Sequence, residues 1–545
     1  MPSIRLQVAP VGDDVTQTAM TQVLRDRSNI WIFVAGAIAV TLGVVLHLPM
    51  FWMGRMDHFK LSGMAMDTDM LIGMGLIVLG IAAACYGMLP RNLAEQIHAS
   101  RHISVAAPED AKLSPAHFRL MFVLVIALVI DVMKPASLGF VMPGLTAEYG
   151  VAKATGALVP FAALTGTVIG SILWGMAADI YGRKASILLS AIMFVGTSIC
   201  GAMPSLAWNV VMCFLMGAAA GGMLPVTYAL LAETMPSRHR GWALVLVGGL
   251  GASGGYFAAS GFSAWLEPVW SWRILWLLNL PTGLFLLLLA TQIPESAKYL
   301  LARGRRGEAQ AVMRQFGTES HGHGSEEEDI DFAPVHAAEN APVRGLWSQG
   351  MIGTTLALSL LALGWGFINF GVLLWLPADL VANGVSLAGA SGLIAKSALI
   401  AVPTVVVVAL LYSRWSTKWS LIVVALVAVL GLLGVIAIKA NLPISPVILL
   451  AALIVGTNAL LAIILPYAAE SYPLHIRGRA TGWIAACTKA GGLAAQALGI
   501  AALVPPLGVA AGMAVVPMLV GAALTLRYCH ETRGIDLRQV DAVSA

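Results

Sequence analysis

The sequence predicts an all-α protein that crosses a membrane many times. Of its 545 residues, 58% are hydrophobic and only 11% are charged, and the mean hydropathy is +0.83. A soluble domain of ordinary composition carries about 25% charged residues, so an ordinary soluble protein is excluded. The apolar residues form long unbroken runs instead of occupying every second position, and this argues against a membrane β-barrel.

The membrane spans can be assigned in order along the chain. A helical span needs about 20 predominantly apolar residues. Two stretches that meet this requirement come first, and twelve more follow after a gap. The predicted spans are 30–49, 70–89, 118–143, 155–178, 185–203, 208–231, 242–264, 273–292, 351–376, 388–411, 419–438, 445–468, 480–501 and 507–527.

The positive charges predict the orientation. If the N-terminus lies inside and the spans alternate, inside segments hold 24 of the 32 Lys and Arg residues and outside segments hold five. Cytoplasmic loops of membrane proteins carry such an excess of positive charge. We therefore expect an integral protein of a bacterial inner membrane with both termini in the cytoplasm.

A long polar break divides the last twelve spans into six and six. The predicted segments are an N-terminal tail and hairpin, a first bundle, a linker, a second bundle and a C-terminal tail, at 1–110, 111–292, 293–350, 351–530 and 531–545. Within the linker, residues 294–316 predict an amphipathic helix. The pattern Glu-x-x-Pro-x-x-x-Arg-Gly begins at Glu233 and again at Glu470, after the fourth span of each half. Repeated halves are typical of secondary transporters, which bind substrate between them.

One loop carries a family resemblance. The segment Gly175-Met-Ala-Ala-Asp179-Ile-Tyr-Gly182-Arg183-Lys184 closely resembles the signature of the major facilitator superfamily. The two glutamate repeats, the segment from Pro294 to Leu300 and the segment Glu531-Thr532-Arg533-Gly534 are similar to its sugar-porter and metabolite-symporter branch. The resemblance covers about residues 115–535. It implies a 12-helix fold of two six-helix bundles, to which this chain adds an N-terminal two-helix hairpin.

The resemblance also implies a cytoplasmic gate. In family members, charges at these positions form a salt-bridge network between the halves that breaks on opening inward. The implied gate residues are Asp179, Arg183, Lys184, Glu233, Arg240, Glu295, Glu470, Arg477 and Glu531.

The second-half loop at 413–418 departs from the pattern, because it lacks the acid and the glycine. The paired glutamines of sugar porters are also missing, which argues against a sugar substrate.

Four charges lie within predicted spans, where an ionisable group is costly and functional by default. Asp131 and Lys134 are three residues apart and share a helix face, and Pro135 is expected to break the local hydrogen-bond ladder. We expect Asp131 to carry a proton and Lys134 to be its counter-ion or a substrate anchor, with a static bridge between them as the alternative. Lys396 and Lys489 add positive charge for an anionic substrate, or extend to an interface.

Three uncharged side chains are further candidates for binding substrate. Asn369 and Asn458 can donate and accept hydrogen bonds, and Trp365 can face the cavity. Their alternative roles are helix-to-helix hydrogen bonding for the asparagines and packing for the tryptophan.

Methionine is concentrated at residues 47–74, most of which are predicted outside. Thioether and imidazole groups are suited to Cu(I), so this region is a candidate copper site. We favour an interfacial cap of adaptable methionines, because no tight Cys or His cluster joins it. The candidate metal ligands are His47, Met50, Met53, Met56 and His58.

Together these features predict a secondary active transporter that imports a small organic metabolite, such as a carboxylate anion, by proton symport and alternating access. The partners are then the small-molecule substrate, the proton and the lipid bilayer. Two alternatives are a copper or other soft-metal transporter and a non-transporting ligand sensor. We expect no enzymatic activity and no cofactor, since no catalytic constellation or cofactor motif is evident. The net charge of +4 does not suggest nucleic acid, and nothing in the sequence sets an oligomeric state.

Overall fold

A computed structural model gives the fold of the chain. It describes residues 30–88, 104–106, 112–302, 305–321, 345–348, 350–439, 445–472, 474–501 and 506–533. Each of the fourteen predicted spans coincides with helix. In the described part, twelve helical stretches are long and apolar enough to cross a membrane by length and composition. The other two are the shorter apolar stretch Ile274–Ala290 and the helix Leu474–Ile500.

The first half contains six helical spans, several of them built from two consecutive helices. These are α5 (Pro115–Tyr149), α6 with α7 (Lys153–Gly156, Leu158–Tyr181), α8 with η2 (Arg183–Gly196, Thr197–Ala202), α9 with α10 (Leu206–Ala220, Met223–Thr234), α11 (Ser237–Trp270), and α12 with α13 (Ile274–Leu277, Asn279–Ala290).

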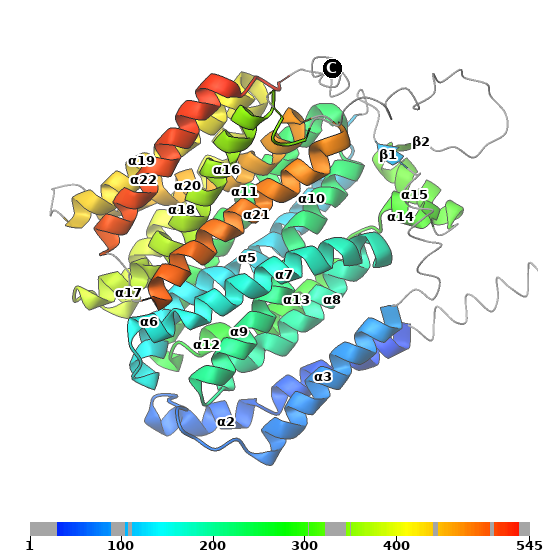
Figure 1. The fold of residues 1–545 in the computed structure, drawn as a ribbon. Helices are drawn as coiled ribbons and strands as arrows, with labels where there is room; N and C mark the ends of the chain where they lie inside the picture. The colour runs from blue at the N-terminus through cyan, green and yellow to red at the C-terminus, as the bar shows by residue number, and fades with distance from the viewer. Residues whose placement is uncertain are drawn as a thin grey trace, which may run out of the picture.

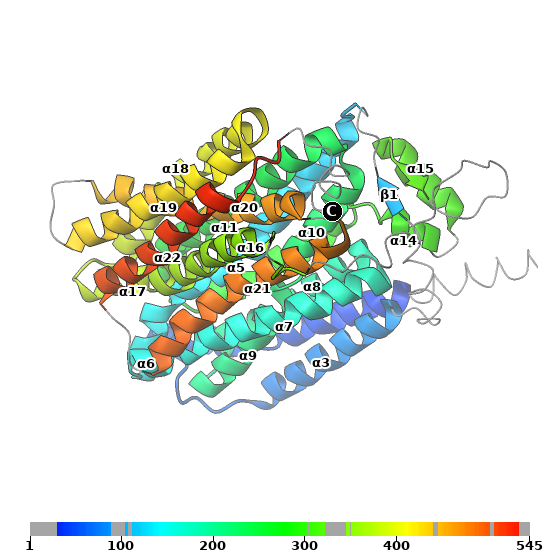
Figure 2. The same cartoon turned by 45° about the horizontal axis from the view of Figure 1, so that its top comes forward.

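The second half has the same number of spans and includes two π-helical segments. They are α16 with η4 and α17 (Ile352–Phe367, Ile368–Leu373, Leu374–Ala382), α18 with η5 (Leu387–Leu410, Leu411–Trp415), α19 (Thr417–Lys439), α20 (Pro446–Ser471), α21 (Leu474–Ile500) and α22 (Leu507–Tyr528). The two sets of helices lie side by side along one direction (Figures 1 and 2).

α5 runs through Pro135 as one continuous helix, so the proline interrupts the hydrogen-bond ladder without ending the helix. A proline has no N–H group, so the carbonyl of Asp131, four residues earlier, receives no amide from it. The surrounding helices nevertheless hold α5 in one continuous helix.

The halves meet along helices that pass close to each other. α11 packs lengthwise against α18, and the hydroxyls of Ser263 and Ser391 are 2.7 Å apart across this contact. Gly139 of α5 lies directly against the backbone of Leu374 in α17, where any larger side chain would collide. These close approaches bring polar groups of the two halves within hydrogen-bond distance.

The linker lies at one end of the bundle, which we call the linker end (Figure 1). The single helix predicted for residues 294–316 is divided into α14 (Ala297–Ala302) and α15 (Arg306–Phe316). After α15 the chain forms β2 (Glu319–His321), which pairs antiparallel with β1 (Ser104–Ala106). The segment before the first bundle is thereby joined to the linker between the bundles.

The N-terminal hairpin consists of a helix described over residues 30–45, followed by α2 (Leu48–Met53), η1 (Gly54–Asp57) and α3 (Thr68–Met88). Its two long helices pack closely because Gly36 faces Gly80 and Gly43 faces Gly73, and a Cβ on any of these glycines would collide with backbone. The hairpin lies along α8. Its loop, residues 54–67, lies at the end opposite the linker, which we call the hairpin-loop end (Figure 2).

The hairpin loop is fastened to the first half by a buried ion pair. Arg273 Nη2 lies 2.7 Å from Glu148 Oε1. The same carboxylate oxygen accepts the backbone N–H groups of Leu61 (2.8 Å) and Ser62 (3.1 Å). Since both charged side chains are almost fully buried, the loop is held as a fixed part of this half.

Candidate functional site

Asp131 lies in the middle of α5 and is 5% exposed. Its Oδ1 atom has no hydrogen-bond partner in the described structure. The carboxylate interacts electrostatically with Lys134 of its own helix and with Lys489 of α21, in the other half. No ion pair within 4.0 Å joins Asp131 to either lysine among the described contacts. The carboxylate thus interacts with one lysine of each half without a direct ion pair to either.

Lys134 is 1% exposed and points toward α8. Its Nζ atom donates to the carbonyl oxygen of Phe194 at 3.1 Å and lies over the ring of the same residue. A cation over an aromatic face is stabilised by the quadrupole of the ring. Lys134 therefore has partners of its own within the first half.

Lys489 approaches the site from the second half. It is half-buried on α21, which contacts α7 of the first half. α21 also lies very close to α16, because Gly366 faces the carbonyl of Thr488 and Gly491 faces that of Leu363. Substituting either glycine would push α21 away and move Lys489.

The wall beside Lys489 is formed by the π-helical segment η4. Trp365 is buried, donates its Nε1–H to the carbonyl of Thr457 at 2.9 Å, and meets Phe370 edge to face. Asn369 is half-buried within η4. Single π-helical turns leave backbone groups without regular partners and are frequent at functional sites. Here the buried amide of Gln496 donates to the carbonyl of Phe370.

Asn458 joins the two halves directly. Its Nδ2 atom donates to Ser253 Oγ on α11 at 3.2 Å, and it is 6% exposed. The structure therefore gives this residue a contact across the interface between the halves. That contact is the helix-to-helix role considered for it from the sequence.

Lys396 does not join this group. It is exposed on α18, on the same stripe as the exposed Leu399, Ile400 and Val407. The opposite stripe of α18 contains Ser391, which contacts α11. Lys396 therefore lies on the outer surface of the bundle, away from Asp131 and Lys489.

At the linker end, the predicted gate residues of the first half form one network. Arg183 Nη2 lies 3.2 Å from Glu233 Oε1, and Glu233 Oε2 accepts the hydroxyl of Ser296 at 2.5 Å. Glu295 Oε1 accepts the backbone N–H of Arg183 at 2.8 Å and of Lys184 at 3.3 Å. Glu295 therefore caps the start of α8. Burial raises the pKa of Glu295, and these hydrogen bonds offset it only in part.

The equivalent residues of the second half form a similar network with different partners. Glu470 Oε2 accepts the hydroxyls of Tyr412 and Thr532, each at 2.7 Å. Glu531 caps α19 by accepting the backbone N–H of Thr417 at 2.9 Å, together with the hydroxyls of Ser416 and Thr417. Burial alone would raise the pKa of Glu531, but these hydrogen bonds outweigh it and lower the pKa to about 2.

Contacts across the halves at this end centre on Glu470. Arg240 at the start of α11 interacts with it electrostatically. The neighbouring Gly241 leaves room for both Glu470 and Tyr412, since a Cβ there would lie 2.9 Å from Glu470 Oε1. The side chains of Asp179 and Arg477 lie outside the described residues.

The candidate metal ligands of the hairpin are divided between two environments. His47 and Met50 are buried, and His47 Nδ1 lies 2.7 Å from the carbonyl oxygen of Gly43. Met53, Met56 and His58 are exposed. Among the described residues, no group of three His, Cys, Asp or Glu side chains could hold a metal ion.

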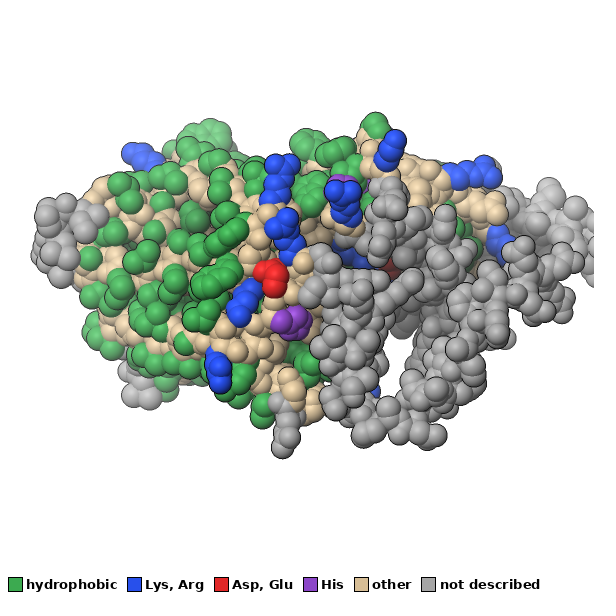
Figure 3. Space-filling view, turned by 90° about the horizontal axis from the view of Figure 1, so that it is seen from above, with side chains coloured by type: hydrophobic (Ala, Val, Ile, Leu, Met, Phe, Trp, Pro, Cys, Tyr) green, Lys and Arg blue, Asp and Glu red, His purple; other side chains and the backbone are tan. Residues whose placement is uncertain are grey.

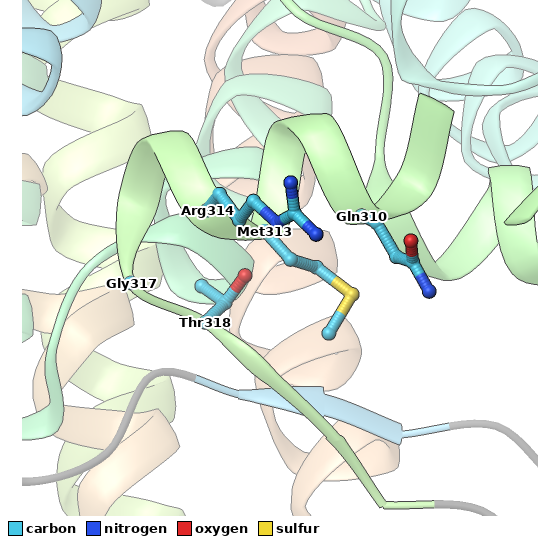
Figure 4. Close-up of a pocket in the computed structure, with 5 residues that line it drawn as sticks. All are labelled: Gln310, Met313, Arg314, Gly317 and Thr318. Atoms are coloured by element: carbon cyan, nitrogen blue, oxygen red, sulfur yellow. The ribbon is translucent and has the colours of Figure 1, made fainter. Parts of the chain in front are cut away.

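Figures 3 and 4 show one face of the molecule and a close-up of a pocket. In Figure 3, hydrophobic side chains cover much of one part of the face, and most of the visible Lys and Arg side chains lie from its middle toward the other part. Figure 4 shows a pocket of about 400 Å³ on α15, lined by Gln310, Met313, Arg314, Gly317 and Thr318. This pocket belongs to the linker and not to the site around Asp131.

Comparison with known proteins places these features in a family. A model of the Major Facilitator Superfamily matches residues 120–496. The chain belongs to the major facilitator superfamily. As a member of it, the protein is an integral membrane transporter of small-molecule metabolites and not an enzyme.

Two relatives in the same superfamily show how far the similarity extends along the chain. The niacin transporter NiaP of Acinetobacter baylyi is 26% identical over 398 residues, which is 72% of this chain and 88% of that protein. The 4-hydroxybenzoate transporter PcaK of the same organism is 32% identical over 219 residues, covering 39% of this chain and 48% of that protein.

Solved structures support the fold. The proton:xylose symporter XylE, bound to 6-bromo-6-deoxy-D-glucose, aligns with a TM-score of 0.61 at 17% identity and covers 78% of this chain and 98% of that one. Its inward open conformation from E. coli aligns with a TM-score of 0.59 at 18% identity. The twelve-helix arrangement of two bundles is therefore confirmed, and the N-terminal hairpin is an addition to it.

The structure adds residues that the sequence analysis did not single out. Gln496 supports η4, Tyr412 holds Glu470, and Glu148 fastens the hairpin loop. The only available signal was that a polar residue lies within or at the end of an apolar segment. Their partners are far away in the sequence, so the pairs could not be recognised there.

Proposed function

We propose that this transporter imports small aromatic carboxylates together with protons. The observation that carries the proposal is the position of Asp131, between Lys134 of its own half and Lys489 of the other. Intramembrane charges that face each other across repeated halves are typical of substrate and ion pathways.

The two lysines are given different roles by their surroundings. Lys134 is engaged with Phe194 inside the first half, so we assign it as the resident counter-ion of Asp131. Lys489 is half-buried and lies on the facing helix, so we assign it as the anchor for the carboxylate of the substrate. Trp365 and Asn369, on the helix that packs against α21, are assigned to the wall around the substrate.

Binding of the proton and binding of the substrate are then coupled through Lys489. When Asp131 binds a proton, Lys489 loses its carboxylate partner and is free to pair with a substrate carboxylate. When the substrate leaves, Asp131 releases the proton and pairs electrostatically with Lys489 again. Each state gives Lys489 one carboxylate partner, so the net charge of the site is the same in both states and the exchange does not add an unpaired buried charge.

The relatives support an aromatic carboxylate as the substrate class. Niacin and 4-hydroxybenzoate, named for two of them, each combine a ring with one carboxyl group. We also propose that the linker end lies in the cytoplasm of a bacterial cell with both termini on that side, because this arrangement follows the distribution of Lys and Arg.

The test is transport by the full chain in proteoliposomes. Uptake of nicotinate, 4-hydroxybenzoate and benzoate is measured with and without an inward proton gradient, with nicotinamide and xylose as uncharged comparisons. We expect the gradient to accelerate uptake of the carboxylates only. In Asp131→Asn, this acceleration should disappear while exchange of substrate across the membrane persists. Undiminished, gradient-driven uptake by Asp131→Asn would exclude the proton-carrying role.

A matched pair of lysine variants tests the anchor. Lys489→Gln removes a charge-assisted contact, so we expect the apparent KM for a carboxylate to rise about ten-fold or more. Lys396→Gln removes an equal charge from the outer surface and should leave KM unchanged. If the two variants behave alike, Lys489 does not bind the substrate.

A further inference from the structure

Glu267 is a second buried acid, near the end of α11 at the hairpin-loop end. It is 5% exposed. Neither of its carboxylate oxygens makes a hydrogen bond of regular geometry in the described structure, although the hydroxyl of Ser263, one turn earlier, is close enough to interact with it. Glu267 is not part of the site around Asp131, whose charged neighbours are Lys134 and Lys489.

The position of Glu267 is at the boundary between the halves. One turn before it, Ser263 Oγ lies 2.7 Å from Ser391 Oγ of α18, and farther along the same contact Gly249 meets Val405. These pairs fix an antiparallel register between the two helices. Extending that register by one turn places Glu267 opposite Leu387, the first residue of α18.

No described cation compensates a negative charge at this place. The charged groups of α5 and α12 at this end are Glu148 and the adjacent Arg273, and they are paired with each other. The facing parts of α18 and α20 offer Ser391 but no charged group, since Lys396 lies on the outer surface of α18. Only the first N–H groups of α18, with their partial positive charge, face this end of the contact.

An ionised carboxylate without donors or a counter-ion is strongly disfavoured in a low-dielectric environment, and such a group binds a proton instead. We propose that Glu267 is a second proton-binding site of this transporter, occupied in the packing seen here and emptied when α11 and α18 separate at the hairpin-loop end. Separation also breaks the Ser263–Ser391 contact, and the Ser263 hydroxyl, which already lies near Glu267, can then donate to the ionised carboxylate without competition from Ser391.

The consequence is a proton site that responds to movement between the halves and not to substrate. Alternating access in such transporters is a rocking of one half against the other. Ionised Glu267 would oppose the return to the packed state, whereas protonated Glu267 permits it. This inference rests on the proposed proton-coupled transport, but its first test does not require transport.

That test is infrared spectroscopy of the purified full chain in lipid, titrated from neutral to alkaline pH. We expect a protonated carboxyl band that disappears on titration and is missing in Glu267→Gln. The band should remain in Asp131→Asn, and in Glu308→Gln, which alters an exposed acid of α15. Protonated carboxyl bands that are identical in Glu267→Gln and the wild type, or the absence of a titrating band that depends on Glu267, overturn the proposal even if proton-coupled transport is confirmed.

Counterflow of labelled nicotinate then tests the role in movement. The measurement uses Asp131→Asn as the background, because Asp131 is itself proposed to carry a proton and would add its own pH dependence. Counterflow in this background should decline at alkaline pH, because the protonated fraction of an acid falls about ten-fold per pH unit once most of it is ionised. Adding Glu267→Gln should abolish this decline, and adding Glu267→Asp should keep it. Identical pH profiles with and without Glu267→Gln would exclude the role.

If Glu267→Gln does not fold, Ser391→Ala provides the test. This variant removes the hydroxyl that competes with Glu267 for Ser263, so the infrared band of the acid should shift as its hydrogen bond with Ser263 strengthens. An unchanged band in Ser391→Ala would contradict the arrangement proposed here.

Discussion

Within its own half, Glu233 is held by a charged partner, whereas its repeat Glu470 is held by neutral ones and has its charged neighbour, Arg240, in the other half. Arg183 and Ser296 surround Glu233, while Tyr412 and Thr532 surround Glu470. Each glutamate also accepts a hydroxyl from the segment that follows the last span of its half. This hydroxyl belongs to Ser296 in the first half and to Thr532 in the second. The repeat therefore preserves the position of the carboxylate and one hydroxyl donor. The contact made by Arg183 in the first half is replaced by the phenol of Tyr412 in the second, where the nearby cation, Arg240, comes from the other half.

The helix caps show the same divergence. Glu295 and Glu531 follow the last span of their halves, and each caps the start of that half's third span. Burial raises the pKa of Glu295. At Glu531 burial is outweighed by hydrogen bonds from Ser416 and Thr417, and the pKa falls to about 2. Equivalent positions can thus have pKa shifts of opposite direction when the depth of burial and the number of hydroxyl donors differ.

The largest expected effect is from Arg183→Ala, which leaves Glu233 partly buried without its counter-ion. Removing a hydrogen bond to a charged group costs about 2 kcal/mol, so we expect a clear fall in the thermal unfolding temperature in detergent. Arg305→Ala is the matched control, because its partner Glu308 is 60% exposed and such pairs contribute about 0–1 kcal/mol.

A second substitution tests the cause. In the double variant Arg183→Ala with Glu233→Gln, the isolated charge is gone and part of the lost stability should return. If stability falls further instead, Arg183 acts through its other contacts and the contrast between the halves is not one of charge.

A smaller loss is expected from Tyr412→Phe, which removes one neutral donor from Glu470 and leaves Thr532 in place. Loss of one hydrogen bond to a buried acceptor amounts to about 1–1.5 kcal/mol. Tyr528→Phe, at a tyrosine that is 54% exposed, should change nothing. A loss for Tyr412→Phe equal to that for Arg183→Ala would show that the two halves hold their glutamates equally strongly.

These pairings mark the limit of what the sequence could predict. The fourteen spans follow from local runs of apolar residues, and all of them coincide with helices. Which face of a helix points inward does not follow from such runs, because these helices are apolar all round. Lys396 and Lys489 therefore looked alike in the sequence, although only Lys489 interacts with Asp131. The partnership of Tyr412 with Glu470 likewise depends on two helices 58 residues apart.

The caps give a prediction that depends on pH. A carboxyl whose pKa falls from 4.5 to about 2 on folding stabilises the fold above pH 4.5, and this contribution is lost as pH falls through that interval. Because Glu531 is partly exposed to solvent, we expect about 1 kcal/mol. Glu531→Gln should lower the unfolding temperature near neutral pH and lose less than the wild type on acidification.

Glu295→Gln is the opposite case. A pKa raised by burial means that the ionised form is disfavoured in the fold, so its contribution improves as pH falls through the folded pKa. This variant should therefore lose little at neutral pH. Equal losses for Glu295→Gln and Glu531→Gln at neutral pH would contradict the difference between the two caps.

The smallest effect is expected from exchanging the shared hydroxyls, Ser296→Thr and Thr532→Ser. Each variant keeps the oxygen that donates to the repeated glutamate and changes one methyl group, so the change should stay within about 0.5 kcal/mol if the site accommodates it. Ser296→Ala and Thr532→Ala remove the donor and should cost about 1 kcal/mol each.

Ser296→Ala should be the milder, because Arg183 still compensates Glu233, whereas Glu470 would retain only the Tyr412 hydroxyl as a direct donor on Oε2. Unfolding temperatures of the four variants decide this order. If Ser296→Ala is the more harmful, the ion pair between Arg183 and Glu233 depends on the Ser296 hydroxyl and does not compensate for its loss.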